Sequence, residues 1–578
     1  MTSAELDPAV PDHPANFVEQ IFAQLKRADS RVVLREIHGE QFTEISGKQL
    51  VEQVSRIRGS LRRLGLQSGE RCALLAPNSI RWVACDLALL AEGVVAIPLY
   101  ARQAPAELAA MMKDSLPRFL FASDTALGEA VAAQLPAQWS SDRRLILFDD
   151  LLGDPTAARQ IPDSPNSLRD SDLVTIIYTS GTSGEPKGVC LNVGNVTHML
   201  GCTRERLDWL MGPAQELDRV FHYGPFSFAA SWITLLTCLS RNCVMTLSTD
   251  LTKLADEIRL SAPHYFLNVP TLLERVRRAV EEGLAKRAAP IRSLYAKARD
   301  AWERKNAGAR QTFDGFWLGL GSRLIFSKIK ERFGPNIRAL ICGSAPLAPD
   351  TQRFFQMLGI PVLQAYGLTE TTAICTLDDP RQPVEPGYVG TTVSGIEMKI
   401  GENEEILVRG PNIFPGYWSR PEETARGLQD GWFHTGDQGE TNERGQWRIT
   451  GRIKNLIVLN SGHKIPPEPI EEKLARLLPA AQQVVLVGNG RGFVCILVTG
   501  AAEPQQVQAA IDTLNPDLPH YRQIRNFTIL PQPFTPESGL LTVMGKLRRD
   551  AINSQFAAEI TAMYADALES KAAAGNHA

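Results

Sequence analysis

The stretch from Tyr178 to Val189, YTSGTSGEPKGV, constrains the fold of this chain more than any other part of its sequence. It follows Leu173 to Ile177, an apolar run typical of a buried strand. Gly181 and Gly184 let backbone amides approach an anion closely, the neighbouring Ser and Thr hydroxyls add donors, and Lys187 adds a positive charge. The pattern predicts a phosphate-binding loop at the end of a buried strand.

The order of residues in this loop excludes the Walker type of phosphate-binding loop. That motif needs a Gly-Lys pair followed directly by Ser or Thr. Here Lys187 is followed by Gly188 and Val189. A different class of nucleotide-binding loop is therefore indicated.

The length of the chain and the order of its apolar runs indicate a large α/β protein. With 578 residues, 44% of them hydrophobic and 22% charged, the chain can bury a core but is too long for one compact domain. Apolar runs at Cys72 to Pro77 and Val94 to Leu99 flank a helical pattern at Trp82 to Leu90. This alternation predicts a parallel sheet layered with helices, with ligand loops at the strand ends.

Several classes of protein are disfavoured by charge and composition. A net charge of −3 gives no general attraction to nucleic acid. The start of the chain, MTSAELDPAVPDHP, lacks the positive charge and apolar run of a secretory signal, and no apolar stretch is long enough to span a membrane, so we expect a cytoplasmic protein. The nine cysteines are scattered without Cys-x-x-Cys pairs, which disfavours zinc and disulfide roles.

The phosphate-loop segment closely resembles the signature of the adenylate-forming superfamily, which includes acyl-CoA synthetases, nonribosomal peptide adenylation domains and luciferases. Further segments match that superfamily in the right order. They are LICGSAPL (340–347), QAYGLTETT (364–372), GWFHTGD (431–437), ITGRIKNLIVLNSGHKIPPEPIE (449–471) and GLLTVMGKLRR (539–549).

The resemblance implies a domain organisation that composition alone does not reveal. It implies a large N-terminal AMP-binding domain of layered sheets and helices over residues 1–453. A small, mobile C-terminal α+β domain over residues 454–578 would carry the catalytic lysine, with the hinge at Lys454. A segment of that length is plausible as an independent fold.

The resemblance also implies the residues that bind ATP and coenzyme A. The phosphate and adenine segments supply most of them, Asp437 and Arg452 would bind the ribose, and Gly462 would lie beside the pantetheine arm of coenzyme A. The full set implied for the phosphates and the adenine is Thr179, Ser180, Gly181, Thr182, Ser183, Gly184, Lys187, Gly343, Ser344, Ala345, Pro346, Gln364, Ala365, Tyr366, Gly367 and Thr369.

The catalytic residues that the resemblance implies are Lys546, Thr182 and Glu370. Lys546 would bridge the acid's carboxylate and a phosphate oxygen, while Glu370 and Thr182 would hold Mg²⁺, which prefers hard oxygen ligands. Each has a plainer interpretation. Lys546 lies in a basic patch with Arg548 and Arg549 that is also typical of an exposed helix start, and Glu370 could merely cap a helix.

The segment from His222 to Trp232, HYGPFSFAASW, matches the part of the family that lines the acyl site. Phe228 occupies the position of the usual histidine. Trp232 falls where some long-chain enzymes place a tunnel-gating tryptophan, and the small Ala229, Ala230 and Ser231 would leave room for a chain. The alternative for Trp232 is an ordinary core aromatic.

Extra length over Arg275 to Asn306 and Phe313 to Gly334 resembles long-chain acyl-CoA synthetases. Basic residues alternate there with Leu, Phe and Trp. Such segments could lie on an anionic membrane surface at its inner face, as a peripheral contact. The alternative, which we favour, is an amphipathic helix pair packed on the large domain with its charges in water.

The sequence thus predicts an AMP-forming ligase that activates a long-chain fatty acid with ATP and transfers the acyl group to coenzyme A, as a monomer or homodimer. Three alternatives stay open: a fatty acyl-AMP ligase that loads an acyl carrier protein, a medium-chain or aryl acid–CoA ligase, and a non-catalytic relative that binds nucleotide or acyl groups. Intact Lys187, Glu370, Asp437 and Lys546 disfavour the last.

Overall fold

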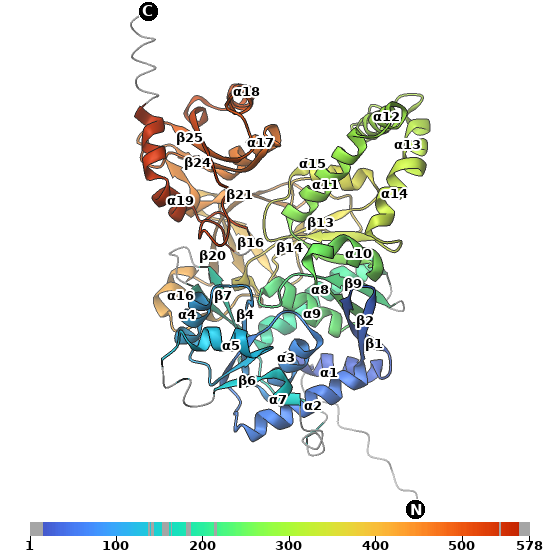
Figure 1. The fold of residues 1–578 in the computed structure, drawn as a ribbon, viewed down its shortest axis with the longest axis vertical. Coiled ribbons are helices and arrows are strands. Elements are labelled where there is room, and N and C mark those ends of the chain that lie inside the picture. The colour runs from blue at the N-terminus through green and yellow to red at the C-terminus, as the bar shows by residue number, and fades with distance from the viewer. Residues whose placement is uncertain are drawn as a thin grey trace, which may run out of the picture. The chain divides into compact units, whose positions relative to one another are not determined.

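The computed structural model describes residues 15–136, 139, 144–152, 161–162, 164–180, 186–212, 217–542 and 545–565. The chain divides into two compact units (Figure 1). The first unit comprises residues 1–397, 408–433 and 443–447, and the second comprises residues 398–407, 434–442 and 448–578. Each unit is described separately below.

The first unit contains a seven-stranded sheet that is parallel at its centre. The strand order is β18-β8-β7-β4-β3-β5-β6, and only the β7–β8 and β8–β18 pairs are antiparallel among the described residues. The strands are β3 (Arg71–Leu75), β4 (Val95–Leu99), β5 (Phe119–Ala122), β6 (Leu145–Leu147), β7 (Leu173–Ser180), β8 (Pro186–Asn192) and β18 (Gly416–Tyr417).

Helices enclose this sheet, which explains why its central strands are apolar throughout. Every residue of β4 is buried, as expected for a parallel strand covered on both faces. The helices are α2 (Gly47–Arg63), α3 (Ile80–Glu92), α4 (Pro105–Ser115), α5 (Thr125–Ala132) and α7 (Phe148–Leu152). The predicted strand–helix–strand pattern is confirmed by β3, α3 and β4.

The bounds of α3 follow from its sequence. The hydroxyl of Ser79 accepts a hydrogen bond from the amide of Trp82, which caps the first turn. The helix ends at Gly93, whose φ of 71° is a left-handed conformation. Glycine adopts this conformation readily because it has no side chain.

A second, nine-stranded sheet of the first unit has the order β15-β14-β13-β12-β11-β9-β10-β1-β2. Its middle, from β13 to β1, is parallel, and both ends are antiparallel. The strands are β1 (Val32–His38), β2 (Gln41–Ser46), β9 (Asp218–His222), β10 (Cys243–Leu247), β11 (Tyr265–Asn268), β12 (Ala339–Cys342), β13 (Val362–Tyr366), β14 (Thr376–Leu377) and β15 (Thr391–Thr392).

Further helices pack on or beside this second sheet. They are α1 (Phe17–Ala28), α8 (Val193–Met211), α9 (Ala229–Leu239), α10 (Leu254–Ser261) and α15 (Pro349–Met357). The shared core includes Phe221, Phe266, Leu340 and Phe355, all buried.

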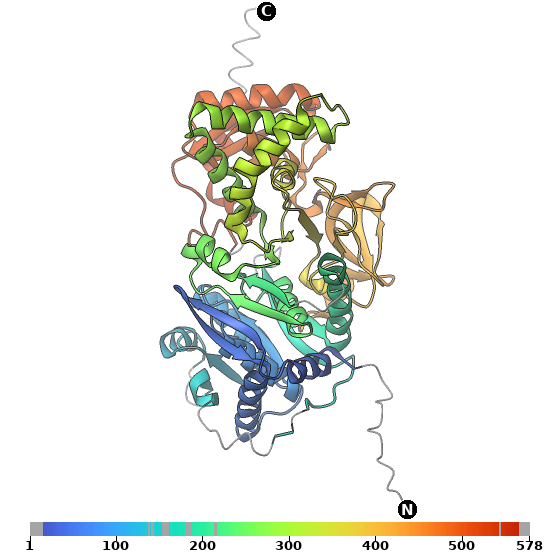
Figure 2. The same ribbon diagram turned by 90° about the vertical axis from the view of Figure 1, so that its right-hand side faces the viewer.

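A group of helices extends from the second sheet between β11 and β12. It comprises α11 (Pro270–Ala285), α12 (Ala289–Asn306), α13 (Asp314–Gly321), a π-helical turn (Ser322–Phe326) and α14 (Ser327–Lys330). Its inner side, including Leu273, Ala298 and Phe326, joins the core of the sheet. Figures 1 and 2 both show α12 and α13 at the end of this group that lies farther from the sheet.

The second unit is an α+β unit built on a small sheet in the order β24-β25-β26. Its main elements are the hairpin β22 (Ile457–Val458) and β23 (Lys464–Ile465), strands β24 (Ala481–Val487), β25 (Val494–Gly500) and β26 (Ile524–Leu530), and helices α17 (Glu468–Leu477), α18 (Pro504–Leu514) and α19 (Arg549–Gln555). Buried cores lie on both faces of the sheet.

The chain passes between the units several times around residues 397–452. The elements of this stretch are β16 (Glu397–Ile400), β17 (Glu405–Arg409), α16 (Pro421–Gly427), β19 (Leu428–Gln429), β20 (Trp432–Thr441) and β21 (Trp447–Arg452). The domain boundary after residue 453 stays a prediction. The α/β fold class with a smaller α+β part is confirmed. Among the described helices, none is both long and apolar enough to cross a bilayer.

Candidate active site

The predicted phosphate-binding segment forms a β-hairpin. Strands β7 and β8 pair antiparallel, with Thr179 opposite Lys187 and Tyr178 opposite Gly188. Lys187 therefore lies in a strand, directly across from Thr179, so their side chains share one face of the sheet. Ser180 ends β7, and its side chain is not described. Four predicted residues, Gly181, Thr182, Ser183 and Gly184, fall outside the described residues.

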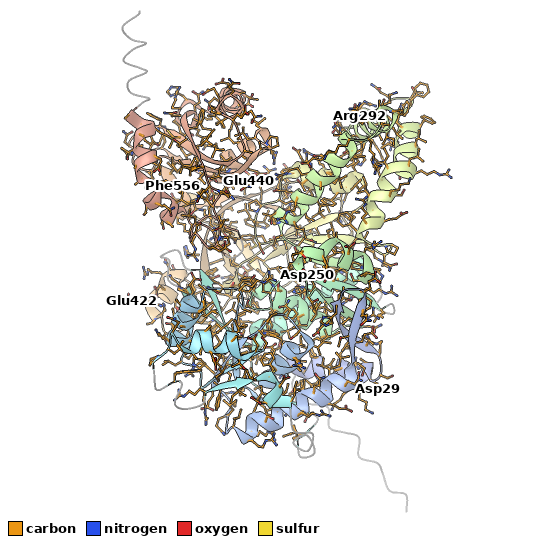
Figure 3. The ribbon with its side chains drawn as sticks, in the orientation of Figure 1. Asp29, Asp250, Arg292, Glu422, Glu440 and Phe556 are labelled. Atoms are coloured by element: carbon orange, nitrogen blue, oxygen red, sulfur yellow. The ribbon has the colours of Figure 1, made fainter. Side chains whose placement is uncertain are left out.

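Lys187 is held between an aromatic ring and a carboxylate. Its Nζ lies 5.5 Å from the ring centroid of Tyr417 and 3.7 Å from Oε1 of Glu423. Tyr417 belongs to β18, which pairs with β8, and Glu423 belongs to α16, the helix that also carries Glu422 in Figure 3. These two contacts hold the ammonium group of Lys187 beside β8, where it can bind an anion.

Glu370 reaches the same place from β13. The chain leaves β13 through Gly367 into a short 3₁₀ turn, Thr369–Thr371. A Cβ at Gly367 would lie 2.2 Å from the carbonyl oxygen of Ala373, so this turn can close only around glycine. Oε1 of Glu370 accepts a hydrogen bond of 2.8 Å from the hydroxyl of Tyr417.

Tyr417 thus contacts both Lys187 and Glu370, yet sequence patterns did not single it out. Burial and the neighbouring charge of Glu370 raise the pKa of Tyr417, so the hydroxyl remains a proton donor at neutral pH. An aromatic pair, Tyr417-Trp418, just before the helix start at Pro421, is the sequence signal that could have marked it.

The two predicted adenine segments are brought together by the sheet. Strands β12 and β13 are parallel neighbours, with Cys342 opposite Gln364, so the residues that follow them leave the same sheet edge. A Cβ at Gly343 would lie 3.2 Å from the carbonyl oxygen of Ala365, which shows how closely the two backbones approach. The segments comprise Gly343, Ser344, Ala345 and Pro346 after β12, and Ala365, Tyr366, Gly367 and Thr369 at and beyond the end of β13.

Within these segments the exposed and buried residues differ in what they can offer a ligand. Ser344, Ala345 and Pro346 are exposed, whereas Tyr366 is buried. The side-chain amide of Gln364 is buried and donates to Oε1 of Gln352 and the carbonyl oxygen of Tyr388, at 2.9 and 3.0 Å. Gln364 therefore braces the strand from inside.

The predicted ribose-binding pair lies in the second unit. Asp437 on β20 is buried, and its Oδ1 lies 2.8 Å from Nε of Arg452 at the end of β21. The backbone amide of Asp437 also donates to the hydroxyl of Thr435 over 3.1 Å. A carboxylate fixed in this way can accept hydrogen bonds from sugar hydroxyls while Arg452 supplies donors.

The loop predicted to approach the pantetheine arm is the turn of the β22–β23 hairpin. Gly462 has φ of 83° there, a left-handed conformation suited to glycine. The ring of His463 stacks on Tyr521 at a centroid distance of 4.2 Å, and Nζ of Lys464 donates to Oδ1 of Asn403 over 3.1 Å. Sequence patterns had left the contacts of His463 and Lys464 unassigned. The predicted hinge residue Lys454 lies in a 3₁₀ turn, Ile453–Asn455.

Lys546 projects from a tight turn just before α19. The amide of Thr542 donates to the carbonyl oxygen of Lys546 over 2.7 Å, and the amide of Lys546 donates to the hydroxyl of Thr542 over 3.0 Å. Lys546 is exposed, and α19 begins three residues later, at Arg549. The lysine is thus presented by a turn and not by the first turn of the helix.

Trp232, from the predicted acyl segment, is buried in the first unit. Its Nε1 donates to Oδ2 of Asp86 over 2.8 Å, and Asp86 lies on α3. Burial raises the pKa of Asp86 to about 7, although the bond from Trp232 acts in the opposite direction. Phe228 is half-buried at the start of α9, with its ring centroid 5.8 Å from that of Tyr100. Trp232 packs as a core aromatic, and its gating role stays a prediction.

Asp86 is a second residue that sequence patterns did not single out. An aspartate in the otherwise apolar helix IRWVACDLALLAE is the signal that could have found it, since a buried acid needs a partner. His222 lies nearby in the chain segment of Trp232 and stacks on Phe226 at 5.1 Å. Burial lowers the pKa of His222 to about 4, so its ring is neutral at physiological pH.

Comparison with known proteins identifies the family. The model of the AMP-binding enzyme family matches residues 21–418, and that of the AMP-binding enzyme C-terminal domain matches residues 454–568. The long-chain-fatty-acid–CoA ligase FadD15 of Mycobacterium bovis is 27% identical over 95% of this chain and 97% of its own. The long-chain-fatty-acid–[acyl-carrier-protein] ligase AEE15 of Arabidopsis thaliana is 26% identical over 92% of this chain and 84% of its own.

Solved structures show the same fold. The o-succinylbenzoate CoA synthetase MenE of Bacillus subtilis, in complex with its acyl-adenylate intermediate, aligns with a TM-score of 0.72 at 20% identity, over 92% of this chain and 97% of its own. The fatty acyl CoA synthetase of Mycobacterium tuberculosis aligns with a TM-score of 0.64 at 21% identity, over 94% of this chain and 99% of its own. The chain therefore belongs to the family of AMP-binding enzymes.

Proposed function

We propose that this protein is an AMP-forming ligase that activates a long-chain fatty acid with ATP and transfers the acyl group to coenzyme A. In the first step a carboxylate oxygen attacks the α-phosphorus of ATP and pyrophosphate leaves. In the second step the thiol of coenzyme A attacks the acyl carbon and AMP leaves. The meeting of Lys187 and Glu370 at Tyr417 is the observation that carries the proposal, because these are two of the residues that the family motifs assign to ATP.

The chemistry demands positive charge and donors more than covalent participation by the protein. A carboxylate and a triphosphate repel each other, and negative charge grows on the leaving pyrophosphate. Lys187 on the hairpin and Lys546 on its turn are proposed to offset that charge, with Thr179, Thr182 and Thr369 donating to phosphate oxygens. Asp437 and Arg452 are proposed to fix the ribose so that the α-phosphorus is held in place.

Glu370 fits the role of a Mg²⁺ ligand. Mg²⁺ in nucleotide sites takes one or two carboxylates together with substrate phosphate oxygens and water. Glu370 is partly exposed beside Lys187, and the bond from Tyr417 fixes the orientation of its carboxylate. When bound, the ion would neutralise charge on the phosphates, and Thr182 would be a further ligand.

The choice of a long-chain acid rests on the relatives and on the acyl segment. FadD15, which aligns over nearly the whole chain, is named for long-chain fatty acids and coenzyme A. In this chain the small residues Ala229 and Ala230 precede Trp232 and would leave room for an acyl chain. The apolar residues Leu235 and Leu236 follow Trp232 along α9. Transfer to an acyl carrier protein is a second candidate, favoured by the similarity to AEE15.

The proposal is tested by acid-dependent release of AMP and pyrophosphate from MgATP. The panel runs from acetate through benzoate to palmitate and oleate, with and without coenzyme A. We expect turnover to peak on long chains and to require coenzyme A. Adenylate that coenzyme A fails to discharge would favour the carrier protein as acceptor, and activity peaking on benzoate or acetate would overturn the long-chain assignment. Absence of any acid-dependent AMP would overturn the ligase assignment itself.

A further inference from the structure

Helix α13 and the π-helical turn after it expose a stripe of large apolar side chains. Phe313 is 70% exposed, Phe316 is 60% exposed and Leu324 is 47% exposed. Together with the half-buried Leu320 they recur every three or four residues, so they lie along one side of the helix. We define these four residues as the apolar stripe. Exposed large apolar residues gathered in this way mark a surface that binds something.

The apolar stripe cannot turn inward, because the opposite side of the helix is fixed. A Cβ at Gly321 would lie 2.4 Å from Cβ of Ala298, so α13 and α12 are in close contact there. Phe326 packs edge-on against Tyr295, with ring centroids 6.4 Å apart. At the other end, the guanidinium of Arg304 donates to the carboxylate of the buried Asp314 at 2.5 to 3.2 Å.

The surroundings of the apolar stripe are basic. From Ala289 to Lys330 the chain carries nine Lys and Arg against three Asp and Glu, whereas the whole chain has a net charge of −3. Arg310, Arg323 and Lys328 are all exposed next to the stripe in sequence. Figure 3 shows another basic residue of the group, Arg292, at the same end of α12 and α13 that lies far from the sheet.

A hollow of about 470 Å³ lies at the base of Phe313 and has the chemistry to hold a phosphate. It is lined by Arg304, Arg310, Thr312, Phe313 and Trp317, with Gln311 and Asp314. Arg304 is paired there with Asp314, so the Arg310 guanidinium and the Thr312 hydroxyl are the groups that suit a headgroup phosphate, and the two aromatic rings suit the carbon atoms attached to it. Basic and apolar groups therefore alternate over a short distance on this surface.

We propose that the apolar stripe and its basic neighbours form a docking surface for an anionic lipid bilayer. The aromatic and leucine side chains would enter the interfacial layer, and the arginine and lysine side chains would contact headgroup phosphates. Gly315 and Gly319 separate the apolar residues on α13, and a Cβ at either would meet no atom within 4 Å, so the stripe protrudes into open space. A protruding stripe suits a fluid bilayer, which yields to its shape, whereas a folded protein partner needs a matching hollow.

The test is sedimentation of the full chain with vesicles of phosphatidylcholine alone or with about a third of phosphatidylglycerol. We expect binding to the anionic vesicles only, weakened several-fold by 0.5 M salt. The double variant Phe313→Ser with Phe316→Ser should lower the partition coefficient at least tenfold, and Arg310→Gln with Arg323→Gln should remove the preference for anionic lipid. Leu116→Ser is the matched control, because Leu116 is 67% exposed elsewhere in the first unit.

Circular dichroism and the melting temperature of each variant check that it folds, since Phe316 contacts the ring of Trp317 at a centroid distance of 5.1 Å. The proposal is overturned if the unmodified chain ignores anionic vesicles, or if the double phenylalanine variant binds them as well as Leu116→Ser does. It is also overturned if the surface captures an acidic acyl carrier protein while vesicles stay unbound. Because no arm of the experiment measures ligation, its failure is separate from failure of the proposed function.

Discussion

Arg549 donates two hydrogen bonds to the carboxylate of Glu471, from Nη1 to Oε1 over 2.8 Å and from Nη2 to Oε2 over 2.6 Å. Oε1 of Glu471 also accepts from the amide of Leu486 over 2.7 Å, so this acid joins α17, β24 and the start of α19. Parallel, charge-assisted bonds of this kind are strong and directional. They fix the chain three residues beyond Lys546 and so hold the base of the turn that presents this lysine.

Glu471→Gln is therefore expected to slow adenylate formation by about tenfold, because a looser turn places Lys546 less accurately. The same change should lower the free energy of unfolding by about 1 to 3 kcal/mol, since the largely buried guanidinium of Arg549 would then face a neutral amide instead of a carboxylate. Pyrophosphate release measures the first half-reaction, and thioester formation from prepared acyl-adenylate measures the second.

Only the rate of the first half-reaction should fall, because Lys546 is assigned to adenylate formation. Glu472→Gln on the same helix is the matched control, since Glu472 forms a more exposed pair with Arg476. An equal loss in both half-reactions would mean that Glu471 acts through stability alone.

Lys546→Ala should reduce acid-dependent pyrophosphate release by about 10² to 10³-fold, the range found when one preorganised donor to a developing charge is removed. Binding of ATP, measured by calorimetry, should change little, because other residues are assigned to its phosphates and base. Lys473→Ala, an exposed lysine on α17, is the control. Unchanged pyrophosphate release in the Lys546 variant would remove this residue from the mechanism.

Tyr417→Phe should raise the Mg²⁺ concentration that gives half-maximal activity by about three- to tenfold. The substitution removes the hydroxyl that orients Glu370 by donating a hydrogen bond to its carboxylate. The ring that contacts Lys187 remains, so the ATP concentration for half-maximal activity should change less than the Mg²⁺ concentration does. Tyr295→Phe, on α12, controls for loss of a hydroxyl elsewhere. A Mg²⁺ dependence identical to that of the unmodified protein would contradict the role assigned to Glu370.

The regular parts of the fold could be predicted from sequence because their signals are local. A strand–helix–strand unit was predicted from the apolar runs at β3 and β4 and the helical pattern between them. The apolar run from Leu173 to Ile177 lies in strand β7, as predicted. The position of Lys187 differed from the predicted loop, because this residue lies in strand β8, opposite Thr179 of β7.

The partners of the site residues could not be predicted, because they come from distant parts of the chain. Glu370 and Tyr417 are 47 residues apart, and Asp86 and Trp232 are 146 apart. Neither pair forms a motif with fixed spacing. Asp437 and Arg452 could be proposed as a pair only because each belongs to a segment that resembles the family.

Asp86→Asn should make the stability of the protein less dependent on pH. The pKa of Asp86 is about 7 in the folded chain and near 3.8 when it unfolds, so between those values the folded chain retains a proton that the unfolded chain has lost. This carboxyl therefore stabilises the fold at low pH and loses that contribution as pH rises toward 7.

The asparagine variant keeps an oxygen that accepts from Trp232 and has no carboxyl to ionise. Relative to the unmodified protein it should gain about 2 to 3 kcal/mol between pH 5 and pH 8, at 1.36 kcal/mol per unit of pKa crossed. Urea unfolding of both proteins at the two pH values measures this difference. Asp378, whose pKa burial also raises to about 7, and His222, whose pKa burial lowers, are present in both proteins, so their contributions cancel in the comparison. Asp149→Asn changes an exposed acid on α7 and should show no such gain. If the free energy of unfolding changed equally with pH in all three proteins, Asp86 would be ionised in the folded chain throughout this range.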